Sequence, residues 1–225
     1  ALLAAMPRKA PLHIPPDLRD APADAAGQLA SYSSGEAPAV PEAIPVLPEP
    51  GNKAIIGTDD RIEFYEAPPY LKGQAEAVAA MALKKLPENA QGKTPPPLCP
   101  SERFYDQPAL AFCTAFLVGP DLMATAGHCI NSDSCANTKF VFDFAVKNPG
   151  EVPSDLGPGS AAYSCKEVLV SKYTYKKRDP DMALVRLDRP VKDREPLRLN
   201  TSGKLVSEGT PVITIGHFLG VPMKI

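Results

Sequence analysis

The feature that most constrains the fold lies between residues 112 and 129, which read FCTAFLVGPDLMATAGHC. Phe112 to Val118 is rich in β-branched and aromatic residues, and Leu122 to Thr125 forms a second short apolar run. Gly119-Pro120-Asp121 between the two runs is typical of a turn. The pattern predicts a β-hairpin that presents His128 just after its second strand.

Two cysteines bracket this hairpin. A disulfide between Cys113 and Cys129 would contribute about 3 kcal/mol by restricting the unfolded chain. Gly127 frees the backbone beside His128, and a histidine held in this way suits a catalytic base. The simpler alternative is a structural histidine at a strand end beside two unrelated thiols.

The sequence Thr125-Ala126-Gly127-His128-Cys129, with the upstream Cys113, resembles the histidine motif of the chymotrypsin-like (trypsin-like) serine peptidases. In that family the two cysteines are bonded, and the histidine takes a proton from a serine nucleophile while an aspartate orients its ring. The resemblance implies a Cys113–Cys129 disulfide and His128 as general base. It also implies an all-β, chymotrypsin-like double β-barrel and hydrolysis of a peptide or protein substrate without cofactor or metal.

A second motif begins at Asp181, 53 positions after His128, where an acidic residue opens the apolar run Met182 to Leu187. It resembles the family's aspartate motif, in which the apolar run follows the aspartate directly. We therefore expect a ring nitrogen of His128 within hydrogen-bond reach of Asp181. Asp179, beside Pro180, is the competing candidate, and a solvated turn cap is the alternative role for either carboxylate.

The family's nucleophile motif does not occur in residues 1–225, which contain neither Gly-x-Ser-Gly nor Gly-x-Ser-x-Gly. In the family, the serine, the oxyanion-hole amides and the specificity pocket all come from the second barrel. Ser202-Gly203 lies in a polar linker and does not fit. We expect the serine beyond Ile225, so that this chain is a fragment or one chain of a cleaved protein and is inactive alone.

Composition divides the chain into three parts. Residues 1–53 hold ten prolines and twelve alanines but one aromatic residue, Tyr32, so they cannot bury a core. A leader or pro-segment of a zymogen and a plain disordered tail remain alternatives for them. Ala54 to Arg61 then resembles the mature start of bacterial glutamyl-endopeptidase-like peptidases, which suggests cleavage near Lys53. Residues 54–199 are expected to form the first barrel, and 200–225 a linker and the incomplete start of the second.

Several short segments predict strands separated by loops rich in glycine and proline, which favours an all-β barrel or sandwich. Lys139 to Phe144 has alternating phenylalanines, and a further strand begins at Cys165. Thr210 to His217 resembles the opening strand of the second barrel, and residues 131–137 are expected to form a polar loop. Residues 71–86 fit a helical face, but the family would place its first strand at residues 77–83, so their state stays open.

The chain has five cysteines, Cys99, Cys113, Cys129, Cys135 and Cys165, and no C-x-x-C pair. This pattern argues against zinc and for disulfides in an oxidising compartment, so we expect a secreted or periplasmic protein. Cys135 and Cys165 each lie beside a strand of the same barrel and are the expected second disulfide. Cys99 is then expected to pair with a cysteine beyond this chain.

Charge and hydropathy exclude other classes. Lysine and arginine total 24 against 26 acidic residues, and no basic run is interleaved with aromatics, so neither nucleic acid nor a membrane is an expected partner.

A catalytically dead pseudopeptidase or binding module on the same fold is the main alternative to an enzyme. A metal protein using His128, His217 and cysteine thiolates is a third, although the spacing matches no common zinc pattern. We interpret His217 as structural, and substrate preference stays unknown.

Overall fold

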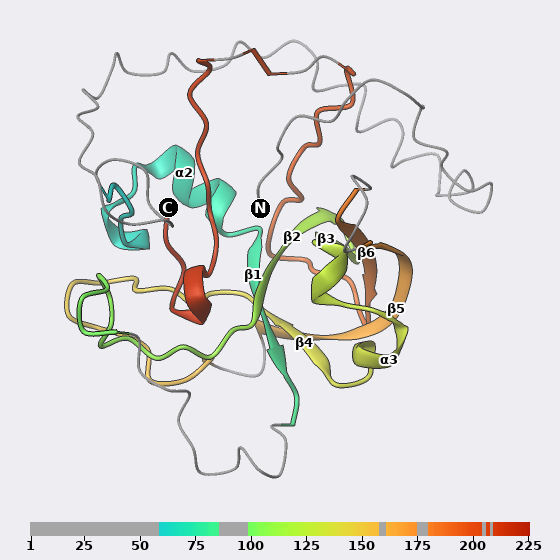
Figure 1. Cartoon of the computed structure of the whole chain (residues 1–225), viewed down its shortest axis with the longest axis horizontal. Coiled ribbons are helices and arrows are strands. Elements are labelled where there is room, and N and C mark those ends of the chain that lie inside the picture. The colour runs from blue at the N-terminus through green and yellow to red at the C-terminus, as the bar shows by residue number, and fades with distance from the viewer. Residues whose placement is uncertain (1–58, 86–98, 158–160, 175–179, 204–205, 208) are drawn as a thin grey trace. The chain divides into compact units, whose positions relative to one another are not determined.

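Six antiparallel strands form a closed barrel in the computed structural model (Figure 1). The structure describes residues 59–85, 99–157, 161–174, 180–203, 206–207 and 209–225. Residues 1–53, the cleavage expected near Lys53 and the candidate Asp179 lie outside the described residues. The strands are β1 (Val78–Leu83), β2 (Cys113–Gly119), β3 (Leu122–Thr125), β4 (Thr138–Val141), β5 (Ala162–Lys172) and β6 (Met182–Leu187), in the spatial order β1-β2-β3-β6-β5-β4.

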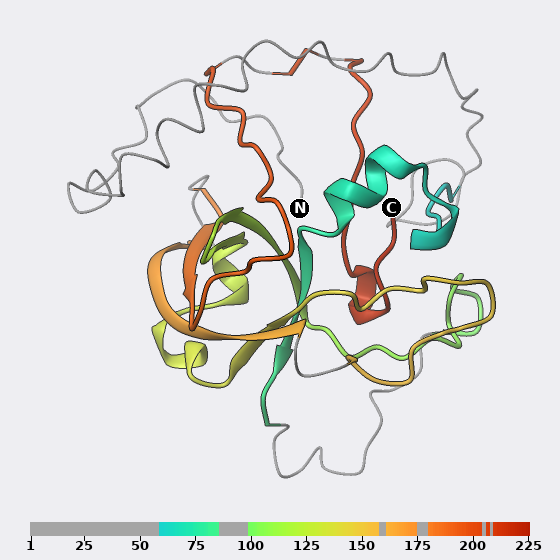
Figure 2. The same ribbon diagram turned by 180° about the vertical axis from the view of Figure 1, so that it is seen from behind.

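The helices are short, and α2 (Pro69–Ala75) and the helical turn near the C-terminus stand clear of the barrel (Figure 2). None of the described helices is long and apolar enough to cross a membrane. They are the α-helices α2 (Pro69–Ala75) and α3 (Ser132–Cys135) and the 3-10 turns η2 (Phe64–Glu66), η4 (Gly127–Cys129) and η6 (Phe218–Gly220). The all-β prediction is therefore confirmed.

Alternation along the strands builds the barrel core. In β6 the side chains of Ala183, Val185 and Leu187 are buried, whereas the residues between them are partly exposed. Leu117 of β2 and Met123 of β3 are fully buried in the same cluster. One face of each strand thus fills the barrel. Functional side chains can therefore lie only at the strand ends or on the outer face.

Residues 71–86 contain both of the structures that the sequence left open. Pro69 lies in the first turn of α2, a position that proline favours because its missing N–H needs no partner there. The helix ends at Ala75, and β1 begins at Val78. The helical pattern therefore describes the first part of this stretch, and the strand implied by the family resemblance describes the second.

The strand predicted from Lys139 to Phe144 ends early, at Val141. Asp143 has φ 66°, in the left-handed region, and its carboxylate pairs with both Lys147 and Arg194. These partners support a conformation that a non-glycine residue seldom adopts. The chain therefore turns away, and the Phe144 ring stacks outside the barrel on His217.

Two further expectations need correction. The loop expected at residues 131–137 contains α3, because the Asn131 carboxamide accepts from the Ser134 N–H and the Ser134 hydroxyl accepts from the Asn131 N–H. The segment Thr210 to His217, expected as a strand, belongs to no strand ladder among the described residues. Within the described residues, only Gly216 makes a β-bridge there, to Lys224, and Val212 is 76% exposed. A strand needs a neighbouring strand to bond with, and none of the described strands pairs with residues 210–215.

Candidate active site

The ends of β3 and β6 bring His128 and Asp181 together. These strands pair antiparallel with Thr125 opposite Ala183, so the chain after β3 and the chain before β6 emerge at the same edge of the barrel. The His128 ring Nδ1 lies 2.7 Å from Asp181 Oδ2, and the His128 backbone N–H donates to Asp181 Oδ1 at 3.0 Å. One carboxylate thus binds both the ring and the backbone of the same histidine.

The hydrogen bonds define the chemistry of this pair. Partial burial acts to raise the pKa of Asp181, but the hydrogen bonds and charge of His128 outweigh it and hold the pKa below its usual value of 3.8. The carboxylate is therefore ionised at neutral pH and can only accept, so Nδ1 must carry the proton. Whenever the ring carries only this proton, its free lone pair is on Nε2, and half of the side chain is exposed, so that this nitrogen can accept a proton from outside.

Gly127 lets the histidine turn lie against the barrel. A Cβ atom at this position would lie 2.1 Å from the backbone oxygen of Lys172 and 3.0 Å from that of Met182. Both neighbours are backbone atoms of paired strands and cannot move aside as a flexible side chain would. Only glycine therefore allows η4 to pack on the ends of β5 and β6.

The structure contains both of the expected disulfides. Cys113–Cys129 joins β2 to the residue after His128, and Cys135–Cys165 joins α3 to β5. Cys99 is exposed and unbonded within the described residues. The disulfides therefore fasten the chain that follows His128, first at Cys129 and again at Cys135.

The Cys113–Cys129 disulfide argues against the alternative in which His128 and cysteine thiolates bind a metal. The sulfurs of Cys113 and Cys129 and a ring nitrogen of His128 lie within 4.8 Å of one another. Sulfurs that are bonded to each other are not thiolates, so this set does not offer the ligands that a soft metal prefers.

His217 belongs to a different part of the molecule. Its ring stacks on Phe144 at 5.9 Å between centroids, and its backbone N–H donates to the Thr114 hydroxyl at 2.9 Å. Burial lowers the pKa of the ring to about 4, a hydrogen bond with the Phe144 backbone opposes this, and the charge of Lys224 adds to it. The ring is therefore neutral at physiological pH and packs as part of the interior.

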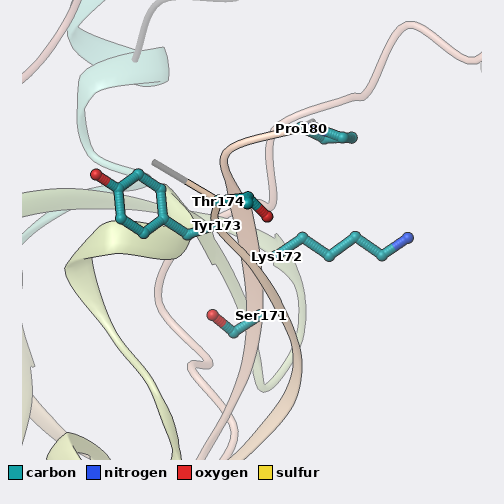
Figure 3. A pocket seen from close by; sticks show the side chains of 5 residues that line it. All are labelled: Ser171, Lys172, Tyr173, Thr174 and Pro180. Carbon is teal, nitrogen blue, oxygen red and sulfur yellow. The ribbon is translucent and has the colours of Figure 1, made fainter. Parts of the chain in front are cut away.

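Two residues that sequence reasoning missed also contact the histidine turn. The Ser171 hydroxyl lies 3.0 Å from the Ile130 carbonyl oxygen and 3.3 Å from that of Gly127. The Tyr173 ring lies edge-on to the His128 ring, with 5.7 Å between centroids. Both residues are at the end of β5, where a pocket of about 450 Å³ is lined by Ser171, Lys172, Tyr173, Thr174 and Pro180 (Figure 3). The pairing of β5 with β6, the strand that follows Asp181, places both residues there, and local sequence does not predict that pairing.

Residues 103–217 match the family described as Trypsin, a little over half of the chain. The chain belongs to the trypsin family. Its closed barrel is the chymotrypsin-like barrel that the histidine motif implied. The match does not distinguish the glutamyl-endopeptidase branch, which stays a prediction.

Three solved structures are similar to this trypsin-family chain. The secreted serine protease VesC from Vibrio cholerae is 16% identical, with TM-score 0.38, over 56% of this chain and 22% of that one. The VesB protease from the same organism is 16% identical, with TM-score 0.37, over 67% and 40%. The scabies mite inactivated protease paralogue S-I1 is 18% identical, with TM-score 0.33, over 55% and 44%. The chain thus spans less than half the length of each. No curated protein matches it in sequence.

Proposed function

We propose that this chain is the part of a secreted serine endopeptidase that holds the general base, His128, and its orienting carboxylate, Asp181. The observation that carries the proposal is the 2.7 Å contact between His128 Nδ1 and Asp181 Oδ2 in a chain of the trypsin family. That contact leaves Nε2 as the basic nitrogen and an ionised carboxylate behind the ring. This is the arrangement that removes a proton from a serine hydroxyl.

The reaction is acyl transfer to water. A serine supplied from outside residues 1–225 attacks the peptide carbonyl while Nε2 of His128 takes its proton, and Asp181 stabilises the resulting imidazolium. The imidazolium then returns the proton to the departing amine, which leaves an acyl-enzyme. Water attacks this ester with the same base, and the serine is regenerated. No Gly-x-Ser-Gly motif occurs within residues 1–225, so the proposal requires a nucleophile from elsewhere.

Processing and location are part of the same proposal. Two disulfides within one small barrel support an oxidising compartment, either outside the cell or in a periplasm. Residues 1–53 are proposed as the leader or pro-segment of a zymogen, 54–199 as the first barrel, and 200–225 as the linker and start of the second. The composition of 1–53, rich in proline and alanine, supports this division.

A binding module that keeps the barrel without catalysis is the second candidate. It is favoured by the lack of a nucleophile motif within residues 1–225. A serine-directed fluorophosphonate probe separates the two candidates when it is applied to the protein made from the complete gene and to residues 1–225 alone. An endopeptidase predicts labelling of the first and not of the second, because without nucleophile and oxyanion hole no covalent adduct forms.

His128→Ala in the complete protein should remove most of this labelling, because an unassisted serine is a weak nucleophile. Labelling of residues 1–225 alone would reveal a nucleophile within this chain and contradict its proposed position. A complete protein that stays unlabelled would favour the binding module.

A further inference from the structure

We propose that the end of β5 is a positioning clamp for the His128 ring. The clamp consists of the Ser171 hydroxyl, the Lys172 backbone and the Tyr173 ring. Its effect on turnover rests on the proposed function, but its effect on the histidine itself does not.

Strand geometry places the clamp beside the catalytic pair. β5 and β6 are antiparallel, with Ser171 opposite Ala183 and Lys172 opposite Met182. The same register continued by one residue brings Tyr173 opposite Asp181. Side chains alternate along a strand, and Figure 3 shows Ser171 and Tyr173 pointing to one side and Lys172 to the other. The side with Ser171 and Tyr173 is the side that contacts the histidine turn.

The Ser171 hydroxyl holds the backbone on both sides of His128. The two carbonyl oxygens that it approaches, at 3.0 and 3.3 Å, belong to Ile130 and Gly127. Its single proton is shared between them. η4 has only three residues. The backbone N–H of Cys129 donates to the Ala126 carbonyl oxygen at 3.1 Å, so the turn makes few hydrogen bonds of its own. Ser171 therefore supplies an anchor that the turn cannot provide for itself.

The Tyr173 ring limits the rotation of the imidazole. Its ring plane is inclined at 62° to that of His128, an edge-to-face arrangement that aromatic rings favour. Half of the His128 side chain is exposed, so solvent alone would allow the ring to turn away from Asp181. The Lys172 backbone completes the clamp, because its carbonyl oxygen closes the space next to Gly127.

The first test reads the histidine directly. The chain has three histidines, so ¹⁵N-histidine NMR spectra are simple, and His128→Ala assigns the signal of interest. We expect a low-field, exchange-protected Nδ1 proton on His128 in the unaltered chain. Ser171→Ala and Tyr173→Leu should each weaken its protection at least about 10-fold, because ring and carboxylate are no longer held in line. Tyr173→Phe should preserve it, since only the ring makes the contact.

Two internal controls keep this test decisive. Thr174→Ala removes an exposed hydroxyl three residues along the same strand end and should leave the His128 signal unchanged. The buried His217 ring reports on the fold. Equal changes at His128 and His217 would assign Ser171 and Tyr173 to general stability and overturn the proposal, as would unchanged His128 signals in both variants.

The second test measures turnover by the protein from the complete gene. Ser171→Ala and Tyr173→Leu should lower kcat about 10-fold with KM nearly unchanged, and Tyr173→Phe should retain activity. A rise in KM at constant kcat would assign the residues to substrate binding and contradict the clamp. A complete protein without activity would reject the proposed function and leave the NMR result as the test of the clamp.

Discussion

At the scale of single residues, the site depends on one carboxylate that binds one histidine twice. The ring bond fixes which nitrogen carries the proton, and the backbone bond holds the turn at His128 against Asp181. A carboxamide of the same size can keep the geometry but not the charge. Asp181→Asn therefore separates the position of the orienting group from its ionisation.

We expect Asp181→Asn to lower kcat by roughly 10³ to 10⁴-fold in the protein from the complete gene, with KM changed little. The amide can donate to Nδ1 and so place the ring proton on Nε2, where it blocks proton transfer. Steady-state kinetics measure the loss, and Asp188→Asn, an exposed aspartate at the other end of β6, is the matched control. A variant with nearly full kcat would show that Asp181 has no role in orienting the base.

His217 gives a second prediction at this scale, about stability and pH. Its folded pKa of about 4 lies below the usual 6.5, so the unfolded chain binds the proton more tightly. The contribution of neutral His217 to the free energy of unfolding is fully present above pH 6.5, declines as the pH falls, and is lost by about pH 4. The loss amounts to at most about 3 kcal/mol. Urea unfolding of the chain at pH 7 and pH 4 measures it, and His217→Phe should flatten this part of the curve.

At the scale of elements, the histidine turn is positioned by close contact between backbones. Gly127→Ala would place a Cβ atom against the Lys172 carbonyl oxygen, and η4 would have to move. We expect a loss of about 2 to 4 kcal/mol in the free energy of unfolding, measured by urea denaturation. Gly73→Ala is the control, because nothing lies within 4 Å of a Cβ atom there and helix α2 should gain stability. Equal effects of both variants would contradict the close contact.

Local chemistry also explains which elements could be predicted from the sequence. The hairpin strand Leu122–Thr125 was predicted with its observed bounds, because turn residues and apolar alternation are adjacent in the chain. The end of β4 was not, because Asp143 owes its left-handed conformation partly to Arg194, 51 positions away. Ser171 and Tyr173 were missed for the same reason, since their partners lie in a distant turn. The His128 and Asp181 pair was predicted only through its family motifs.

At the scale of the whole described chain, its first and last described segments are joined by a buried ion pair. Lys224 Nζ lies 3.0 Å from Glu63 Oε2 and 2.8 Å from Gln107 Oε1, and Gln107 Nε2 donates to Glu63 Oε1. Backbone bonds between Ile62 and Ile225 continue the contact. Burial lowers the pKa of Lys224, and the charge of Glu63 opposes this. Each charge is therefore tolerated because the other is present.

This mutual dependence predicts coupled mutational effects. Glu63→Gln leaves the buried ammonium without its counter-charge, and Lys224→Met leaves the carboxylate without its own. Each single change should cost about 3 to 5 kcal/mol in the free energy of unfolding. The double variant should cost clearly less than the sum, because no uncompensated charge remains. Urea denaturation of the four chains completes the cycle, and additive losses would show that the two side chains do not stabilise each other.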